Sequence, residues 1–267
     1  MKKLHILVTG AASGIGRAAC ELLIRNGHAV YAIDLSPITD LGAEACFTAD
    51  VTDSARLTEI AAELRSRAVC IDAILTVAGV HAMASLVEDD INKSARLIDI
   101  NLIGTMRTVS AFHPLLGARG RVVILTSEVG TLDPLPFNGL YTVSKCALES
   151  YAQALRQELN LIGQRVITVR PGAIETPLAG GSIRATEALA ERTVLYRKQA
   201  ARFSGIAKRF MGKPISPERL AKVIERAIVA KHPRLAYNKH RSAGLLLLNI
   251  LPKRMQCGII RLLLGRG

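Results

Sequence analysis

The sequence predicts an α/β fold in which helices cover both faces of a doubly wound parallel sheet. Short apolar runs rich in β-branched residues recur along the first two thirds of the chain, and helical patterns separate them. Strands of continuous apolar character are typical of parallel sheets that are buried on both faces. The right-handed crossover rule then leaves essentially the doubly wound arrangement.

The individual elements follow from local patterns. The first run ends in a glycine, the helix at 54–67 repeats apolar residues at helical spacing, and the helix at 216–230 opens with Ser216 as cap and Pro217 in its first turn. The expected strands are 4–10, 29–34, 45–49, 71–79, 121–127, 165–170 and 233–237, and the expected helices are 14–26, 54–67, 92–112, 141–163 and 216–230.

Composition limits the class of protein. The chain has 267 residues, 49% of them hydrophobic and 21% charged, which indicates a folded chain long enough to bury one large core. Its five cysteines lie far apart without a CxxC pair, so neither a metal site nor disulfides are expected. The apolar run in MKKLHILVTG is too short for a secretory signal, and we expect a cytoplasmic protein.

The positive charge is concentrated in the C-terminal third. The net charge is +13, and residues 178–267 hold 19 Lys and Arg against 4 Asp and Glu. These cations are not interleaved with stacking aromatic residues and Trp is absent, which argues against a nucleic-acid partner. An anionic lipid surface or an acidic substrate fits at least as well.

A glycine-rich turn, TGAASGIG at 9–16, joins the first strand to the first helix. Gly10 permits the tight turn, while Gly14 and Gly16 let the backbone approach a pyrophosphate and let the helix pack on the strand. The phosphates would lie on the N–H groups of the helix N-terminus. We therefore expect a dinucleotide site that also includes Ser13 and Ile15.

Two acidic residues follow later strands. Asp34 ends the second strand, at the separation expected for a carboxylate that binds the adenosine ribose hydroxyls, although it could instead cap a loop. Because neither Ser13 nor Leu35 offers an arginine for a 2′-phosphate, NAD is favoured over NADP. Asp50, which is followed by Val51, has two open interpretations: it binds the adenine amino group, or it caps the helix at 54.

The YTVSK segment places Tyr141 and Lys145 four residues apart, on one face of a helix. A phenol has an ordinary pKa near ~10, and a nearby ammonium and an oxidised nicotinamide ring would lower it. Tyr141 would then exchange a proton with a substrate alcohol. Ser127, at the carboxyl edge of the sheet, could hold the substrate oxygen beside it.

The segments TGAASGIG, YTVSK and RPGAIET, together with Ser127, resemble the short-chain dehydrogenase/reductase family over nearly the whole chain. The resemblance implies a Rossmann-type domain and an NAD(P)-dependent alcohol–ketone oxidoreductase. It also implies a catalytic tetrad of Asn101, Ser127, Tyr141 and Lys145, in which Asn101 of the NxxG element holds a water that links the lysine to solvent.

The resemblance extends to the cofactor loops. It implies that Pro171, Gly172, Ile174 and Thr176 belong to a loop that closes over the nicotinamide. Where the family has NNAG, this chain has Thr76-Val77-Ala78-Gly79, so Ala78 and Gly79 are kept and the asparagine that supports the sheet is lost. His81 and Glu128 are expected to be solvated loop residues.

The alternation of predicted strands and helices ends after Pro177. Residues 178–212 lie where the family places its substrate lid, and 241–267 form a tail of two short apolar helices split by Pro252-Lys253-Arg254. We expect domain boundaries at 1–240 and 241–267. The expected apolar lip of the lid consists of Leu178, Ile183, Leu189, Leu195, Phe203, Ile206, Phe210 and Met211.

The lid and the tail together are similar to those of the branch that acts on steroids, retinoids and other lipids, so a hydrophobic secondary alcohol or ketone is the expected substrate. The apolar runs of the tail fall far below the roughly 20 residues that span a bilayer. The tail could lie in a membrane interface, which we favour, or be buried in a contact between subunits of a homodimer or tetramer. The competing function is an NAD-binding sensor or membrane-associated module of the same fold without catalysis.

Overall fold

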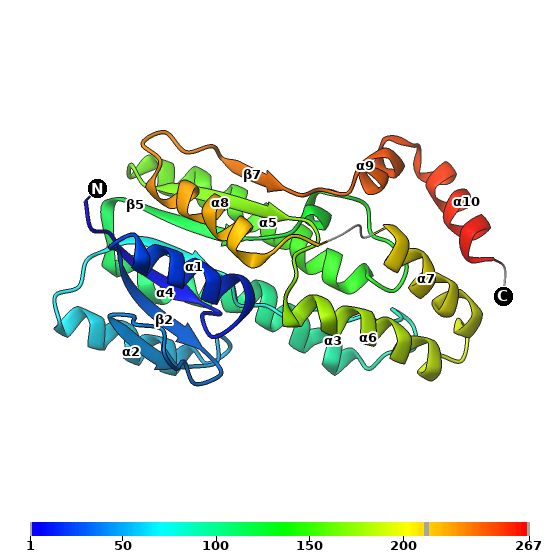
Figure 1. Ribbon diagram of the computed structural model, residues 1–267, viewed down its shortest axis with the longest axis horizontal. Coiled ribbons are helices and arrows are strands. Elements are labelled where there is room, and N and C mark those ends of the chain that lie inside the picture. Colours follow the sequence, from blue (N-terminus) through cyan, green and yellow to red (C-terminus); the bar gives the residue numbers. More distant parts are fainter. Residues whose placement is uncertain (1, 211–213, 266–267) are drawn as a thin grey trace.

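The structure is a computed structural model, and the residues it describes are 2–210 and 214–265, apart from the side chains of 177–184 and 207–210. Its centre is a parallel sheet in the order β3-β2-β1-β4-β5-β6-β7 (Figure 1). The strands are β1 (His5–Thr9), β2 (Ala29–Asp34), β3 (Ala45–Thr48), β4 (Ile71–Thr76), β5 (Leu116–Leu125), β6 (Arg165–Pro171) and β7 (Ala236–Lys239). The predicted doubly wound sheet is confirmed.

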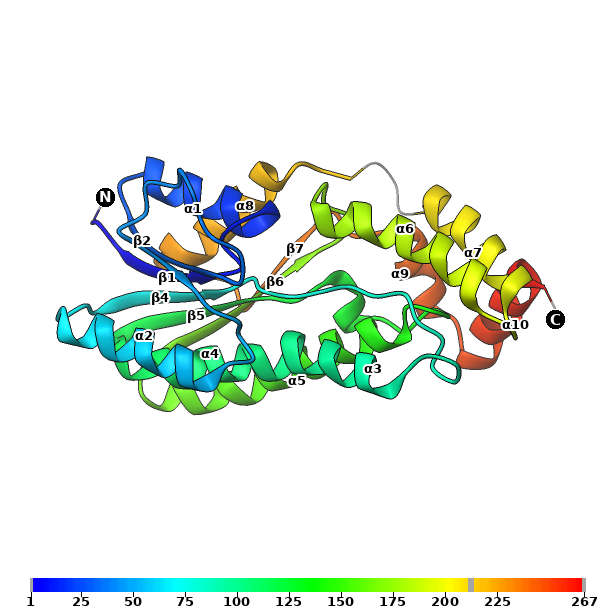
Figure 2. The same ribbon diagram turned by 90° about the horizontal axis from the view of Figure 1, so that it is seen from below.

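Helices cover both faces of this sheet (Figure 2). One face carries α1 (Gly14–Arg25) and α8 (Pro217–Val229), and the other carries α2 (Ser54–Ser66), α4 (Gly104–Phe112) and α5 (Gly139–Leu161). Each face has its own apolar core, because successive strand residues alternate between the two sides. Burial on both sides explains why the strands are almost continuously apolar.

The strand order reverses at β1, which pairs with both β2 and β4. Ligands of doubly wound sheets bind at such a reversal, outside the carboxyl ends of the strands. Gly10 follows β1 with a φ of 74°, and a Cβ built on it would lie 2.6 Å from the backbone nitrogen of Ala78, after β4. The two loops therefore touch at the reversal, and only a glycine fits at position 10.

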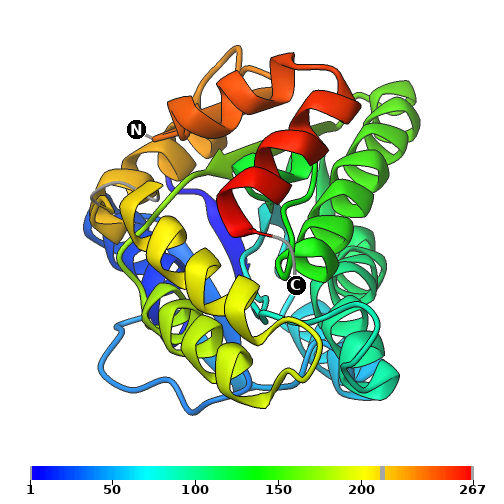
Figure 3. The same ribbon diagram turned by 90° about the vertical axis from the view of Figure 1, so that its right-hand side faces the viewer.

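Helices also gather beyond the carboxyl ends of the strands (Figures 1 and 3). They are α3 (Ile91–Ile98), α6 (Pro177–Arg192), α7 (Arg197–Phe210), α9 (Ala243–Ile250) and α10 (Lys253–Leu264). A third apolar cluster joins α10 to α7 through Leu264, Ala200 and Phe203. The lid and the two-helix tail therefore pack against each other at this end of the molecule.

Three expected elements differ most from the observed ones. The strand expected at 121–127 is β5, which begins earlier, at Leu116, and ends at Leu125. The expected helix 92–112 is interrupted by a turn of π-helix at Asp99–Ile103, so α3 and α4 are separate segments. The last strand begins later than 233–237, because β6 pairs with it from Thr168↔Ala236 to Pro171↔Lys239. Within residues 2–210 and 214–265, no helix combines the length and the apolar character that crossing a membrane requires.

Candidate active site

A cavity of about 910 Å³ lies at the carboxyl edge of the sheet. Its lining brings together almost all of the predicted site residues: Gly10, Ser13, Gly14, Ile15, Asp34, Asp50, Val51, Ala78, Gly79, Ser127, Tyr141, Lys145, Pro171, Gly172, Ile174 and Thr176. Gly16 and Asn101 are buried just behind it. The predicted cofactor and catalytic residues thus share one continuous space.

The glycine turn forms one wall of this cavity. Gly14 begins α1 with a φ of 52°, and Ser13 precedes it without capping the helix through its side chain. A Cβ on Gly16 would lie 1.8 Å from the carbonyl oxygen of Gly10, so Gly16 lets the helix approach the turn. The N-terminus of α1 therefore faces the cavity as an anion-binding site, and its residues fit a dinucleotide pyrophosphate.

Asp34 lies at the carboxyl end of β2 and lines the cavity. Its carboxylate accepts hydrogen bonds of 2.9 Å from the backbone N–H groups of Ala12 and Ser36, which orient it. A carboxylate fixed in this way can accept further hydrogen bonds from a diol. Neither of the next two lining residues, Leu35 and Ser36, carries a positive charge.

Asp50 is held by different partners from those expected. Its carboxylate accepts hydrogen bonds from the N–H of Thr52 (2.9 Å) and the guanidinium of Arg96 (2.6 Å). Burial raises the pKa of Asp50, but these hydrogen bonds outweigh burial and hold the pKa below its ordinary value. The capping interpretation is wrong, because Asp53 caps α2 by accepting from the N–H of Arg56. Arg96, which also lines the cavity, had no signal in the sequence.

Tyr141 lies in the first turn of α5, hydrogen-bonded to Ser127. The ammonium of Lys145 lies 5.7 Å from the centre of the Tyr141 ring, as their spacing predicted. Desolvation raises the pKa of Tyr141 to about 12, and the Ser127 hydrogen bond acts in the opposite direction. The protein side chains alone therefore do not produce the expected lowering of the Tyr141 pKa. That expectation also required the positive charge of a nicotinamide ring.

Lys145 is buried, and its ammonium donates to the carbonyl of Leu125 (3.3 Å). Burial lowers the pKa of Lys145 to about 8, while the carboxylate of Glu149 acts to raise it. Because 8 is above neutrality, most of the lysine is still an ammonium at pH 7. The side chain can therefore stabilise negative charge on the nearby phenol.

Asn101 lies in the π-helical turn and is completely buried. Its amide oxygen accepts from the N–H of Val80 (2.7 Å), and its nitrogen donates to the Val80 carbonyl (2.9 Å) and to Ser144 (3.1 Å). A Cβ on Gly79 would lie 3.1 Å from the Asn101 oxygen and 3.8 Å from the Lys145 nitrogen. Asn101 and Lys145 thus flank Gly79, and the water-holding role of Asn101 stays a prediction.

His81 is not a solvated loop residue, and that expectation is wrong. Its ring packs edge-on against Tyr141, with ring centres 4.6 Å apart, and its Nε2 is hydrogen-bonded to Asn138 (3.0 Å). Burial lowers the pKa of His81, so the imidazole is neutral at pH 7. Since His81 lies in an irregular loop, no periodicity could have identified it.

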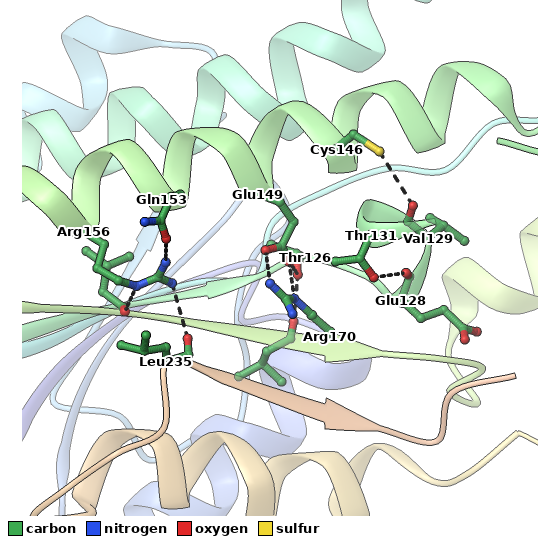
Figure 4. A network of polar contacts seen from close by, with 12 residues as sticks. Thr126, Glu128, Val129, Thr131, Cys146, Glu149, Gln153, Arg156, Arg170 and Leu235 are labelled. Atoms are coloured by element: carbon green, nitrogen blue, oxygen red, sulfur yellow. Dashed lines mark hydrogen bonds and ion pairs between the residues drawn. The ribbon is translucent and has the colours of Figure 1, made fainter. Parts of the chain in front are cut away.

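Glu128 is also buried, contrary to expectation. Its carboxylate accepts from the N–H of Ser242 (2.6 Å), at the start of α9. Burial raises the pKa of Glu128, and the Ser242 hydrogen bond opposes that rise. In Figure 4 the carboxylate of Glu128 points away from Glu149 and Arg170. The residue after Ser127 therefore connects to the C-terminal tail.

Residues of the C-terminal tail line the part of the cavity that the glycine turn does not, and this lining is called the roof. Its lining residues are Ser242, Gly244, Leu245, Leu247, Leu248, Leu251, Ile259, Ile260, Leu263 and Leu264. Asp133 anchors this roof: its N–H donates to Asn249 (2.7 Å), and its carboxylate pairs with Lys253 and accepts from Gln256 (2.9 Å). The tail therefore has a role at the cavity that the sequence had not predicted.

Two of the four expected lip residues whose side chains the structure describes line the cavity. Phe203 and Ile206 line the cavity, whereas Leu189 is buried in the cluster between the lid helices and Leu195 is 63% exposed. The expected lip residues Leu178, Ile183, Phe210 and Met211 fall outside the described residues or side chains.

Similarity to known proteins agrees with this geometry. Residues 4–187 match the family model described as short chain dehydrogenase. Mouse retinol dehydrogenase 5 is 28% identical over 98% of this chain and 89% of its own length. A 3-ketodihydrosphingosine reductase from Bacteroides thetaiotaomicron is 28% identical over 66% of each chain.

Solved structures share the fold. A short-chain dehydrogenase from Burkholderia cenocepacia, determined in complex with NADP, superposes with a TM-score of 0.74 and 19% identity over 99% of both chains. A family member from Francisella tularensis gives a TM-score of 0.74 with 22% identity, over 89% of this chain and 97% of the other. On the match of residues 4–187, the chain belongs to the short-chain dehydrogenase family of oxidoreductases.

Proposed function

We propose that this oxidoreductase uses NAD to interconvert a hydrophobic secondary alcohol and its ketone. The observation that carries the proposal is one cavity in which Ser127, Tyr141 and Lys145 lie between a dinucleotide-type turn and an apolar roof. The substrate carbon to be oxidised or reduced would lie beside Tyr141.

The chain's own residues handle the proton. In the direction of reduction, the Tyr141 hydroxyl donates a proton to the substrate oxygen, and Ser127 holds that oxygen through a second hydrogen bond. The Lys145 ammonium stabilises the phenolate that forms, and Asn101 would hold a water that returns a proton from solvent. Bound nicotinamide supplies or accepts the hydride. Oxidation of the alcohol is the same sequence in reverse.

Asp34 supports NAD as the cofactor. Its oriented carboxylate suits ribose hydroxyls and would repel a 2′-phosphate, and no positive charge follows at Leu35 or Ser36. The glycine turn, Asp34 and the loop from Pro171 to Thr176 are the residues that would hold the dinucleotide.

The roof supports a lipid-like substrate. Leu245, Leu248 and Leu251 of the tail line the cavity together with Phe203 and Ile206 of the lid. A ligand that buries apolar surface against these side chains gains binding free energy of about 25 cal/mol for each Å² removed from water. The names of the relatives retinol dehydrogenase 5 and 3-ketodihydrosphingosine reductase indicate substrates of the same kind.

A panel of steroid, retinoid and long-chain alcohols and ketones, followed by NADH absorbance, tests the proposal. Turnover of at least one member is expected, and Tyr141→Phe should lower kcat by about 10²–10⁴-fold with dinucleotide binding retained. The competing function, an NAD-binding sensor without catalysis, predicts calorimetric NADH binding with no turnover across the panel. An unchanged rate in Tyr141→Phe would refute the catalytic assignment.

We also propose that the tail contacts an anionic membrane surface. Its outer side exposes large apolar residues: Leu247 is 70%, Ile250 78% and Leu262 82% exposed. Residues 241–267 contain no Asp or Glu, and Lys253 and Arg254 are the first two residues of α10. Leu247 also lines the cavity, so the surface borders the substrate end. Such a combination suits a helix pair lying in the headgroup region.

Sedimentation with vesicles tests the membrane surface. A variant with Leu247, Ile250 and Leu262 changed to Ser should lose binding to phosphatidylglycerol vesicles. The matched control changes Leu161, which is 85% exposed at the C-terminal end of α5, to Ser and should bind normally. Equal recovery of both variants would remove the membrane proposal. Loss of a dimer in light scattering, without any vesicle binding, would instead assign the surface to a contact between subunits.

A further inference from the structure

A largely buried carboxylate lies behind the candidate catalytic lysine. Glu149 is one helical turn beyond Lys145 on α5, and its side chain is 12% exposed. One carboxylate oxygen accepts from the hydroxyl of Thr126 (2.6 Å) and from Nε of Arg170 (2.8 Å), and the other accepts from an Nη of Arg170 (2.6 Å). Figure 4 shows these three side chains converging between the helix and the sheet.

Each partner of Glu149 directly precedes a residue of the site. Thr126 precedes Ser127 at the end of β5, and Arg170 precedes Pro171 at the end of β6. The bidentate pair with Arg170 restricts both position and orientation, as arginine–carboxylate pairs do. A single carboxylate therefore ties the helix that carries Tyr141 to the two strand ends that carry the rest of the site.

We propose that Glu149 is a positioning residue that acts through Lys145. Its carboxylate keeps the Lys145 side chain charged and holds α5 in place against the strand end that precedes Ser127. The proposal rests on the oxidoreductase site described above only for the role of Lys145. The charge state of Lys145 is a property of the folded protein and can be measured without a substrate.

The charges around Lys145 indicate which group controls it. Tyr141 and Glu149 face it from α5, His81 approaches from the loop after β4, and Arg170 lies on β6 behind Glu149. Glu128, from the turn after β5, instead pairs with the tail. Tyr141 and His81 are neutral at pH 7 because burial raises the pKa of the first and lowers that of the second. Glu149 is therefore the counter-charge of Lys145.

The size of the effect matters because the pKa of Lys145 is only about 8. A group with that pKa is about nine-tenths protonated at pH 7. An opposite charge nearby shifts a pKa by roughly one unit or more, so loss of Glu149 would leave about half of the lysine charged at pH 7. Arg170 fixes the carboxylate but also partly neutralises it, so its loss should act in the opposite direction.

Competitive labelling with acetic anhydride across pH 6–11, read by mass spectrometry of the Lys145 peptide, measures the proton affinity of the lysine directly. Glu149→Gln should move the midpoint to lower pH by about one unit, and Arg170→Gln should move it to higher pH. Glu149→Asp, which keeps the charge, should restore most of the shift. Glu158→Gln removes a solvent-exposed carboxylate from the same helix and should leave the midpoint unchanged.

The control for folding is thermal unfolding of each variant, with labelling kept well below its midpoint. The proposal is supported if the labelling midpoint of Lys145 moves to lower pH in Glu149→Gln, moves to higher pH in Arg170→Gln and stays unchanged in Glu158→Gln. An unmoved midpoint in folded Glu149→Gln overturns it, and so does a shift in the same direction for both partners. These outcomes stand whether or not any substrate of the panel is turned over, so they are separate from the proposed reaction.

Discussion

The two ends of the cavity are built in different ways. The proposed cofactor end includes short segments that follow strands, such as Gly10 after β1 and Ala78 after β4. The proposed substrate end is lined by residues of the lid and the tail, and the tail lies more than a hundred residues after Ser127 in the sequence. The glycine turn tolerates few changes, because a Cβ on Gly10 or Gly16 would meet backbone atoms. A surface of apolar side chains can change its shape gradually while the candidate catalytic residues stay in place.

The largest effect is expected from Gly16→Ala at the cofactor end. The new Cβ would lie 1.8 Å from the Gly10 carbonyl, so the turn must move away from the helix. We expect calorimetry to show dinucleotide affinity lower by at least about 100-fold, roughly 3 kcal/mol. Gly205→Ala in α7 is the matched control: apart from its chain neighbours and its own helix backbone, no atom of the described residues lies within 4 Å of the new Cβ, so affinity should be unchanged. Similar losses in both variants would contradict the comparison.

A change of cofactor preference should be smaller. Replacing Asp34 by Asn and Leu35 by Arg removes a carboxylate that suits ribose hydroxyls and adds a cation that suits a 2′-phosphate. The ratio of kcat/KM for NAD to that for NADP should fall by about 10- to 100-fold, since charge-assisted hydrogen bonds contribute about 1.5–3 kcal/mol. A parent enzyme that already prefers NADP would show that Asp34 does not select the cofactor.

The pH dependence reports on the centre of the cavity, between the two ends. Since burial lowers the pKa of Lys145 to about 8, the ammonium is present below that pH and is lost above it. The rate of ketone reduction should be level from pH 6.5 to 7.5 and should fall up to tenfold per unit well above pH 8. In Lys145→Arg this fall should disappear below pH 10, because a guanidinium keeps its proton. An identical fall in that variant would assign it to another group.

The smallest effect is expected at the roof. Leu248→Ser removes apolar lining, and we expect KM for a lipid-like substrate to rise about three- to tenfold, roughly 1 kcal/mol, with a smaller change in kcat. Ile250→Ser, on the outer side of the same helix, should leave KM unchanged in assays without lipid. If both variants behave alike, the tail does not form the substrate end.

Much of the fold and the cofactor end could be predicted because their signals are local. Strand runs, helix spacing, the glycine turn and the Tyr141–Lys145 pair each lie within a few residues of sequence, and the structure places them together. The break at Asp99–Ile103 was missed because a π-helical turn keeps helical dihedrals and nearly helical spacing. Capping of α2 stayed open as one of two interpretations of Asp50, because Asp50 and Asp53 are both capping residue types and only the hydrogen bonds distinguish them.

The parallel sheet, its dinucleotide-type turn and the spacing of the candidate catalytic residues could therefore be read from the sequence, since each depends on periodicity or on backbone conformations available to glycine. Which distant side chains meet could be seen only in the folded molecule. The pairs Glu128–Ser242 and Glu149–Arg170, the ring contact of His81 with Tyr141 and the inward side of the tail all join segments that lie far apart in the sequence. Such contacts arise when elements pack, and packing is not encoded in any one stretch of chain.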